Sequence, residues 1–204
     1  IERISPEHEE IFLQRANIFS KKKNHPKAIE LLKKALNVCE EPTEIWNLLG
    51  MEYLFQEDYI KAKKYFHKCV KENTLDYQSL YNLLYCYDQL GENVEAIETL
   101  NNLLEINPYS EVAWHQLGKI YIKINKTEEA LSAFEFAIIS DDCYTSAYIE
   151  KGKLLEQMGR INEAIANYNF SLNFNDPNAF VNHRIGLCHL KLGNENLAIR
   201  YFEE

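Results

Sequence analysis

The sequence predicts an all-α fold, a solenoid of antiparallel helix pairs, and three observations support this prediction. A pattern of apolar and small residues recurs every 34 residues without insertion. Within each repeat, apolar residues return every three or four positions in two segments, which is the periodicity of an amphipathic helix. Seven Gly and five Pro in 204 residues are few, as expected for helices joined by short loops. The repeat is clearest at one alanine position, occupied by Ala28, Ala62, Ala96, Ala130, Ala164 and Ala198.

The repeat frame divides the chain into five complete repeats and a shortened sixth, after a lead-in of residues 1–8. In a repeat numbered from 1 to 34, positions 4, 7, 8 and 11 share one helix face, and positions 20, 24 and 27 share another. We therefore expect two amphipathic helices in each repeat, and we expect the natural chain to continue beyond Glu204. The repeats are residues 9–42, 43–76, 77–110, 111–144, 145–178 and 179–204.

Small residues at fixed positions indicate how the two helices of a repeat meet. Position 8 is glycine in four repeats, and we expect it to face the alanine at position 20, so that the helices approach closely. The turn between the helices is predicted near position 15, where Gly and Asn tolerate the left-handed conformation that ends a helix. The residues at this turn position are Gly91, Asn125, Gly159 and Gly193.

The chain resembles the tetratricopeptide repeat family over essentially its whole length. That family's pattern is Trp, Leu-Gly, Tyr, Ala, Phe, Ala and Pro at positions 4, 7–8, 11, 20, 24, 27 and 32. The second repeat shows it in Trp46, Leu49-Gly50, Tyr53, Ala62 and Phe66. The resemblance implies a right-handed superhelix in which the first helix of each repeat lines the inner wall.

Some positions depart from the family pattern. Arg15 and Lys151 replace the apolar residue at position 7, and Asn182 replaces the aromatic residue at position 4. We expect Arg15 to face solvent. Lys151 should be partly buried, with its stem packed and its amine reaching water or an acidic side chain.

Charge and cysteine content restrict the partners. The net charge is −9, which disfavours nucleic acid and anionic membranes, because both bind proteins largely through basic side chains. No apolar run is long enough for a transmembrane helix. Five scattered cysteines without a CxxC pair do not form a disulfide framework. A reducing compartment follows, and we expect a cytoplasmic protein.

The sequence offers no constellation for catalysis. The histidines show no HxxxH pair, and Cys188 and His189 are adjacent, so they point in different directions. Phosphate loops and nucleophile motifs are absent from the sequence. We therefore predict a non-enzymatic chain without cofactor or metal.

The resemblance places the functional surface on the inner wall, at positions 2, 5, 9, 12 and 13. There the fourth repeat carries a cationic stripe, with tyrosines in the third repeat. Tyrosines would supply apolar area and lysines would meet carboxylates, so the surface fits a partner peptide, and we take that peptide to be acidic. The competing interpretation is a solvated helix face that carries lysines. The predicted groove residues are Asn47, Tyr81, Tyr85, His115, Lys119, Lys123 and Lys153.

The leading interpretation is a non-catalytic protein-interaction scaffold that binds a partner protein or peptide in the concave groove. The alternative is a regulatory or substrate-recruiting region of a larger multidomain enzyme, since this fold serves many roles. RNA binding by helical repeats is a third reading, and the net charge disfavours it. A further hypothesis is homodimerisation through the sixth repeat, where Leu197, Ile199 and Phe202 would lack a neighbouring helix.

Overall fold

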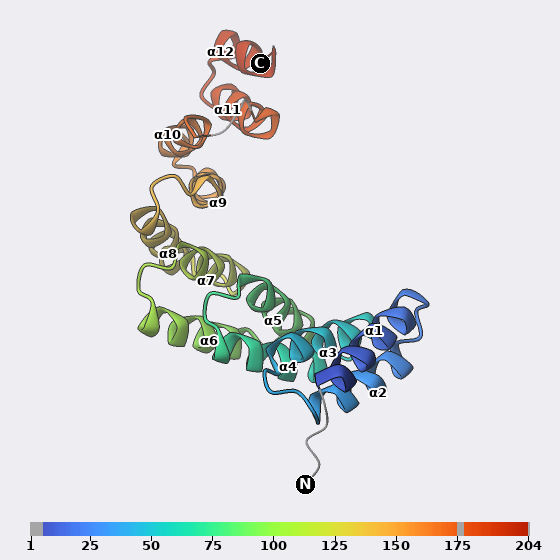
Figure 1. Ribbon diagram of the computed structural model, residues 1–204. Coiled ribbons are helices and arrows are strands. Elements are labelled where there is room, and N and C mark those ends of the chain that lie inside the picture. The colour runs from blue at the N-terminus through green and yellow to red at the C-terminus, as the bar shows by residue number, and fades with distance from the viewer. Residues whose placement is uncertain (1–5, 175–177, 204) are drawn as a thin grey trace. The chain divides into compact units, whose positions relative to one another are not determined.

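The computed structural model describes residues 6–174 and 178–203, which form twelve α-helices (Figure 1). The all-α prediction is thereby confirmed for these residues. The chain forms two compact units, residues 1–96 (unit 1) and residues 97–204 (unit 2). Helix α6 (Asn93–Ile106) contains the boundary between them. Of the predicted lead-in, residues 6–8 belong to the first helix, and residues 1–5 lie outside the described range.

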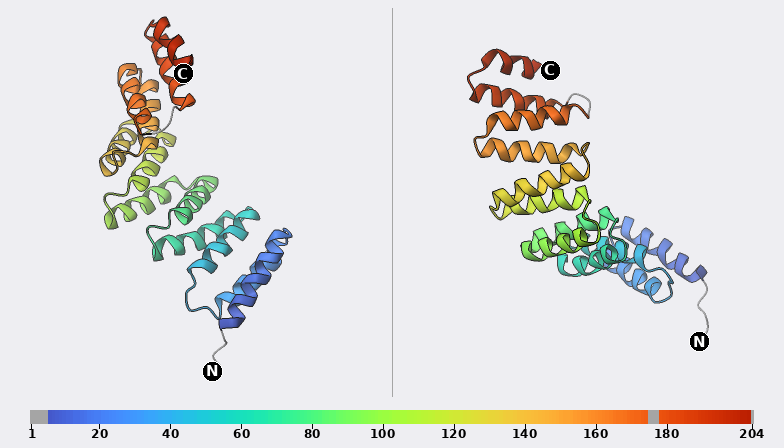
Figure 2. Two further views of the ribbon diagram at one scale, coloured as in Figure 1. Left: turned by 45° about the horizontal axis from the view of Figure 1, so that its top comes forward. Right: turned by 90° about the vertical axis from the view of Figure 1, so that its left-hand side faces the viewer.

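Unit 1 is a run of helices in which each helix packs on the next one in the chain (Figures 1 and 2). Its core is formed by large, fully buried side chains from the middle of the run, including Leu49, Phe66 and Leu83. The helices are α1 (Pro6–Lys21), α2 (His25–Leu36), α3 (Thr43–Phe55), α4 (Tyr59–Glu72) and α5 (Tyr77–Leu90).

Within unit 2, consecutive helices are in contact from α7 to α12 (Figure 2). Leu117, Phe134, Leu155, Tyr168 and Ile185 are almost completely buried and form its core. After α6 the helices are α7 (Glu111–Lys123), α8 (Thr127–Ser140), α9 (Thr145–Gln157), α10 (Ile161–Leu172), α11 (Ala179–Lys191) and α12 (Glu195–Glu203).

Short polar caps explain where several helices begin. The side chains of Asp58, Asp76 and Ser110 accept hydrogen bonds from backbone amides in the first turns of α4, α5 and α7. Such caps satisfy amides that have no partner within the helix. Helices α3, α5, α7, α9 and α11 begin at the first residues of the second to sixth predicted repeats, namely Thr43, Tyr77, Glu111, Thr145 and Ala179.

A glycine under an aromatic ring sets the distance between the helices of a pair. A Cβ atom added at Gly50 would lie 2.7 Å from the Phe66 ring, and one at Gly118 would lie 2.6 Å from the Phe134 ring. Gly152 and Gly186 have the same relation to the residues at position 24 of their repeats. The ring at position 24 is thus the nearest neighbour of these glycines, which the sequence did not predict, and the facing of the alanine at position 20 stays a prediction.

The turn at position 15 is left-handed in every repeat. The predicted residues Gly91, Asn125, Gly159 and Gly193 all have positive φ, as expected. The first two repeats hold the same conformation with residues that do not favour it, Lys23 at φ 57° and Glu57 at φ 59°. Sequence reasoning missed these two because neither residue type signals a left-handed turn.

Both predictions about charged residues at position 7 are confirmed. Arg15 is exposed. The Lys151 side chain is only 18% exposed, and its Nζ lies 3.0 Å from a carboxylate oxygen of Glu135. Within the described ranges, every helix is too short or too polar to cross a bilayer.

Glu57→Gly should stabilise the protein by about 1 kcal/mol, because glycine occupies the left-handed region without the clash that a Cβ causes. Urea unfolding of the variant and the wild type measures the difference. Glu57→Ala is the control, since it removes the side chain and keeps the strained backbone. Equal stability of the Gly and Ala variants would show that the turn stores no strain.

Candidate partner-binding surfaces

Asn47, the first predicted groove residue, connects two helices of unit 1. Its Nδ2 donates a hydrogen bond of 2.8 Å to Oγ of Ser79, which joins α3 to α5. One turn away, Nδ2 of Asn82 lies 3.5 Å from Sδ of Met51 and joins the same helices. Asn47 is half-buried and already hydrogen-bonded, so its role in this structure is to hold α3 against α5.

The tyrosines of α5 are accessible. Tyr81 is 40% exposed and Tyr85, one turn later, is 47% exposed. The Tyr85 ring meets the Tyr59 ring edge-on, with 6.1 Å between centroids. On α3, Leu48 and Phe55 are also exposed, at positions 6 and 13 of the second repeat. The first helices of unit 1 therefore present an apolar and aromatic surface.

His115 of α7 is buried rather than open to a partner. Its ring lies 5.4 Å from the Tyr144 ring and 5.8 Å from the Phe134 ring, between centroids. Neither ring nitrogen has a hydrogen-bond partner within the described residues. Burial, followed by the charge of Lys119, lowers the pKa of His115 to about 4. The ring is therefore neutral at pH 7 and packs as a core residue.

Two of the predicted lysines of unit 2, Lys119 and Lys153, lie near this histidine. Lys119 and Lys123 are exposed on α7, and Lys153 is half-buried on α9. Nζ of Lys153 lies 2.9 Å from a carboxylate oxygen of Glu150 and 5.1 Å from the centroid of the Phe180 ring on α11. The charges of Lys119, Glu150 and Lys153 all influence the pKa of His115, which places them near one another.

We call the accessible part of this region the unit 2 surface and define it as Lys119, Lys123, Lys153, Phe180 and His183. Phe180 is 47% exposed, and the His183 ring lies tilted against the Phe202 ring with 5.4 Å between centroids. Phe180 stands at position 2, which the resemblance places on the inner wall, but the sequence prediction selected polar and tyrosine side chains and did not include it. The predicted residues Asn47, Tyr81 and Tyr85 belong to unit 1, so the two surfaces are described separately.

A buried carboxylate fixes the helices beneath the unit 2 surface. The Glu156 side chain is only 4% exposed, and its oxygens lie 2.5 Å from Arg184 and 2.6 Å from Lys191. Burial alone would raise the pKa of Glu156, but the hydrogen bond from Lys191 and the charge of Arg184 outweigh it and lower the pKa. Two cations of α11 are thereby held against α9.

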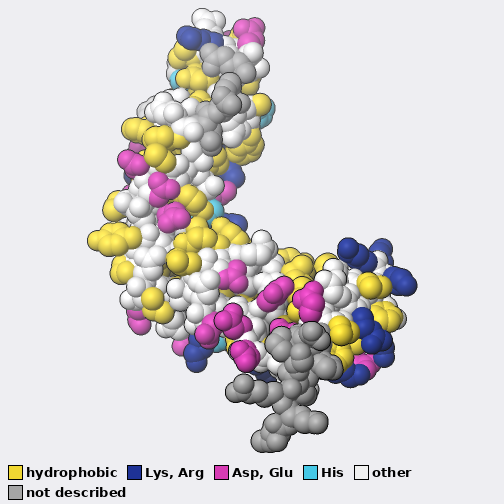
Figure 3. All heavy atoms as spheres, in the orientation of Figure 1, with side chains coloured by type: hydrophobic (Ala, Val, Ile, Leu, Met, Phe, Trp, Pro, Cys, Tyr) yellow, Lys and Arg dark blue, Asp and Glu magenta, His cyan; other side chains and the backbone are white. Residues whose placement is uncertain are grey.

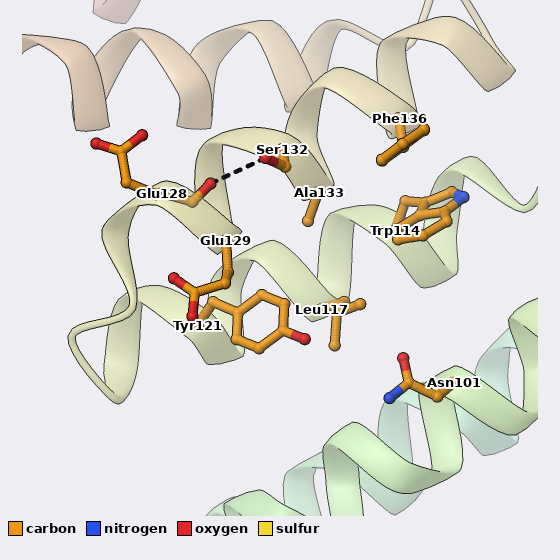
Figure 4. Close-up of a pocket in the computed structure, with 9 residues that line it drawn as sticks. All are labelled: Asn101, Trp114, Leu117, Tyr121, Glu128, Glu129, Ser132, Ala133 and Phe136. Atoms are coloured by element: carbon orange, nitrogen blue, oxygen red, sulfur yellow. Dashed lines mark hydrogen bonds between the residues drawn. The ribbon is translucent and has the colours of Figure 1, made fainter.

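A groove lined by α6, α7 and α8 has a volume of about 420 Å³ (Figure 4). At one end, the Trp114 and Phe136 rings stack with 4.7 Å between centroids. Glu128 and Glu129 lie toward the other end, and Asn101 of α6 lies on the side of Leu117 and Trp114 (Figure 4). The repeat pattern did not reveal this groove, because its walls come from two repeats.

One group of side chains has the spacing of a metal site. Ligand atoms of Asp141, Asp142 and Cys143 lie within 4.8 Å of one another, and all three residues are exposed. The hydrogen bond to Asp142 raises the pKa of the Cys143 thiol, which disfavours the thiolate that binds metals. This group therefore gives no argument for a metal centre.

Comparison with known families gives two matches along the chain. Residues 12–148 match the family described as ChAPs (Chs5p-Arf1p-binding proteins). Residues 145–174 and 181–204 match the tetratricopeptide repeat. Together the two matches cover residues 12–174 and 181–204, which confirms the resemblance inferred from the repeat pattern.

Among curated proteins, anaphase-promoting complex subunit 3 of Schizosaccharomyces pombe is 26% identical over 187 residues, covering 92% of this chain and 28% of that protein. Human protein O-mannosyl-transferase TMTC3 is 24% identical over 186 residues, covering 83% of this chain and 20% of that protein. The chain thus spans less than a third of the length of either relative.

A crystal structure of the MamA protein superposes on this fold with a TM-score of 0.64 and 25% identity, covering 81% of this chain and 90% of MamA. The predicted solenoid of antiparallel helix pairs is thereby confirmed as the fold class.

The buried His115 should make stability depend on pH. The unfolded chain binds a proton at the ordinary pKa of 6.5, whereas the folded chain binds it only near pH 4. This contribution to stability is therefore complete above pH 6.5 and is lost as the pH falls toward 4, by roughly 2–3 kcal/mol. His115→Phe should flatten the stability profile in that range, measured by urea unfolding at several pH values.

The exposed and non-titrating Val94 of α6 provides the control. Val94→Ala should leave the slope of the wild-type profile unchanged. A His115→Phe profile that falls as steeply as the wild type between pH 6.5 and 4 would show that His115 is not the titrating group.

Proposed function

This chain belongs to the ChAPs family, the Chs5p-Arf1p-binding proteins, within the tetratricopeptide-repeat class, and we propose that it holds an acidic partner segment against the unit 2 surface. It is a helical scaffold of the type found in protein-interaction modules. The family is described by its binding to other proteins, which supports a protein as the ligand.

The observation that carries this proposal is the pairing of accessible cations with an accessible aromatic ring. Lys119 is exposed and makes no ion pair among the described residues. Lys153 stands beside Phe180, whose ring is about half exposed. A segment that carries a carboxylate and an apolar side chain would satisfy both groups. His115 is left out of the proposed contact surface because it is buried.

An alternative function is favoured by one relative. Human TMTC3 is named a protein O-mannosyl-transferase, and this chain matches only 20% of it. The chain would then be the substrate-recruiting or regulatory region of a larger enzyme. The coding sequence on either side of the present chain distinguishes the two, because only the enzyme reading requires a catalytic domain in the same polypeptide.

Lys119→Glu/Lys153→Glu should abolish capture of the partner from a lysate of the source organism, because the carboxylates would repel an acidic segment. Wild type and variant are used as bait in parallel, and captured proteins are identified by mass spectrometry. A partner held by the wild type and lost by the variant would support the proposal.

The control is Lys126→Glu/Arg160→Glu, which changes the charge equally at the starts of α8 and α10. Acidic residues are well tolerated at helix N-termini. If the control loses the same partner, net charge rather than the unit 2 surface determines capture. If neither variant loses it, the partner binds elsewhere on the chain.

We also propose that α12 mediates self-association. Leu197, Ile199 and Phe202 are 43%, 55% and 43% exposed, which leaves apolar area on one short helix. Leu197→Glu/Ile199→Glu should shift the protein toward monomer in sedimentation equilibrium, whereas Ile60→Glu on α4 should not. A wild type that is monomeric at high concentration would reject this proposal.

A further inference from the structure

Helix α4 concentrates positive charge in an acidic chain. Within its 14 residues it carries five lysines and one histidine against a single glutamate, Glu72. The chain as a whole has a net charge of −9. Other cations of unit 1 lie on α1, on α2 and on the turn between them, and Lys and Arg side chains gather at one end of the unit in Figure 3. The lysines of α4 are Lys61, Lys63, Lys64, Lys68 and Lys71.

Part of this helix lines a groove with α5. The groove has a volume of about 370 Å³ and is lined by Lys63, Lys64, His67, Lys68 and Tyr87. Three of its five residues are lysines and a fourth is a histidine. Side chains of like charge repel one another in a concave site, and an anion bound among them would relieve that repulsion.

The protein neutralises only part of this charge. Nζ of Lys63 lies 2.5 Å from a carboxylate oxygen of Glu92. Nζ of Lys68 lies 5.0 Å from the centroid of the Trp46 ring. Among the described residues, no carboxylate forms an ion pair with Lys68. Lys64 and His67 are exposed and form no ion pair within the described ranges.

The fold does not require these cations, as the following repeat shows. The groove of unit 2 in Figure 4 has Tyr121 at the repeat position of Tyr87. One wall of this groove is formed by α6, which is the second helix of its repeat, as α4 is of the preceding repeat. At the positions that match the cations of α4, the residues of α6 are neutral or acidic. The residues there are Ile97, Glu98, Asn101 and Asn102, in place of Lys63, Lys64, His67 and Lys68.

From the charge and shape of this groove we propose that it binds a short carboxylate-rich segment of a partner protein. The ligand contacts Lys64, His67 and Lys68, and Tyr87 supplies an apolar wall. This site is separate from the unit 2 surface, and it does not depend on the function proposed for that surface.

Carboxylates at both ends of α4 and beside the groove favour a short polypeptide ligand over an extended polyanion. Asp58 precedes α4, Glu72 ends it, and Glu92 lies at the edge of the groove beside Lys63. A membrane plane or a nucleic acid strand would extend past the groove and meet these carboxylates. A peptide of a few acidic residues fits between them.

The test uses a fluorescein-labelled peptide of alternating Glu and Gly, and its Gln counterpart, in fluorescence anisotropy at low ionic strength. The wild type should bind the Glu peptide and not the Gln peptide. Lys64→Glu should weaken binding by roughly tenfold or more, because it reverses a charge inside the groove. Lys64→Gln/His67→Gln should also weaken it, which separates loss of attraction from added repulsion.

Lys22→Glu is the matched control, because it makes the same charge change on an exposed residue of unit 1 outside the groove. It should retain wild-type affinity. Circular dichroism verifies that each variant is folded. Equal loss in Lys22→Glu and Lys64→Glu, or binding of the Gln peptide, would overturn the proposal. Tighter binding of a phosphoserine peptide, phosphatidylserine vesicles or single-stranded RNA would overturn it as well.

Discussion

In four of the helix pairs that the structure describes, the contact between a glycine and an aromatic ring controls the geometry of the pair. Gly50 lies under Phe66 and Gly118 under Phe134, so closely that a Cβ atom would overlap the ring. Close packing of this kind tolerates little change in volume. Because the same contact recurs at the same positions in these four pairs, they keep a similar separation. The strict spacing of the repeat follows from it, since an inserted residue would rotate the ring away from the glycine.

The glycine and ring positions of the repeat serve packing, so functional differences between repeats depend on the positions outside the core. Position 25 shows this: His67 and Asn101 occupy it in successive repeats and line grooves of different charge. A buried charge needs a partner to offset its desolvation, as the ion pairs of Glu156 with Arg184 and Lys191 show. An exposed charge needs none, so surface charge varies freely between repeats while the core does not.

The sequence was sufficient to predict features that recur in every repeat. It was insufficient to predict features that depend on a particular contact with a neighbouring helix or loop. Helix pairs, the left-handed turn at Gly159 and the paired Lys151 all follow from local pattern. Position 5 was predicted to be accessible, yet His115 is covered by rings from the helix and loop that follow it. Glu57 adopts the left-handed turn against its own preference, because the packing on either side fixes the backbone there.

Net charge describes the whole chain, whereas binding depends on charge over a few ångströms. At ordinary ionic strength, charges farther apart than about 8–10 Å are largely screened from one another. The acidic side chains that make this chain negative therefore do not cancel the lysines of α4 or of the unit 2 surface. They act only where they lie beside them, as Glu92 does for Lys63 and Glu150 for Lys153. A net charge of −9 consequently argues against long polyanions and remains compatible with short acidic segments held in local cationic sites.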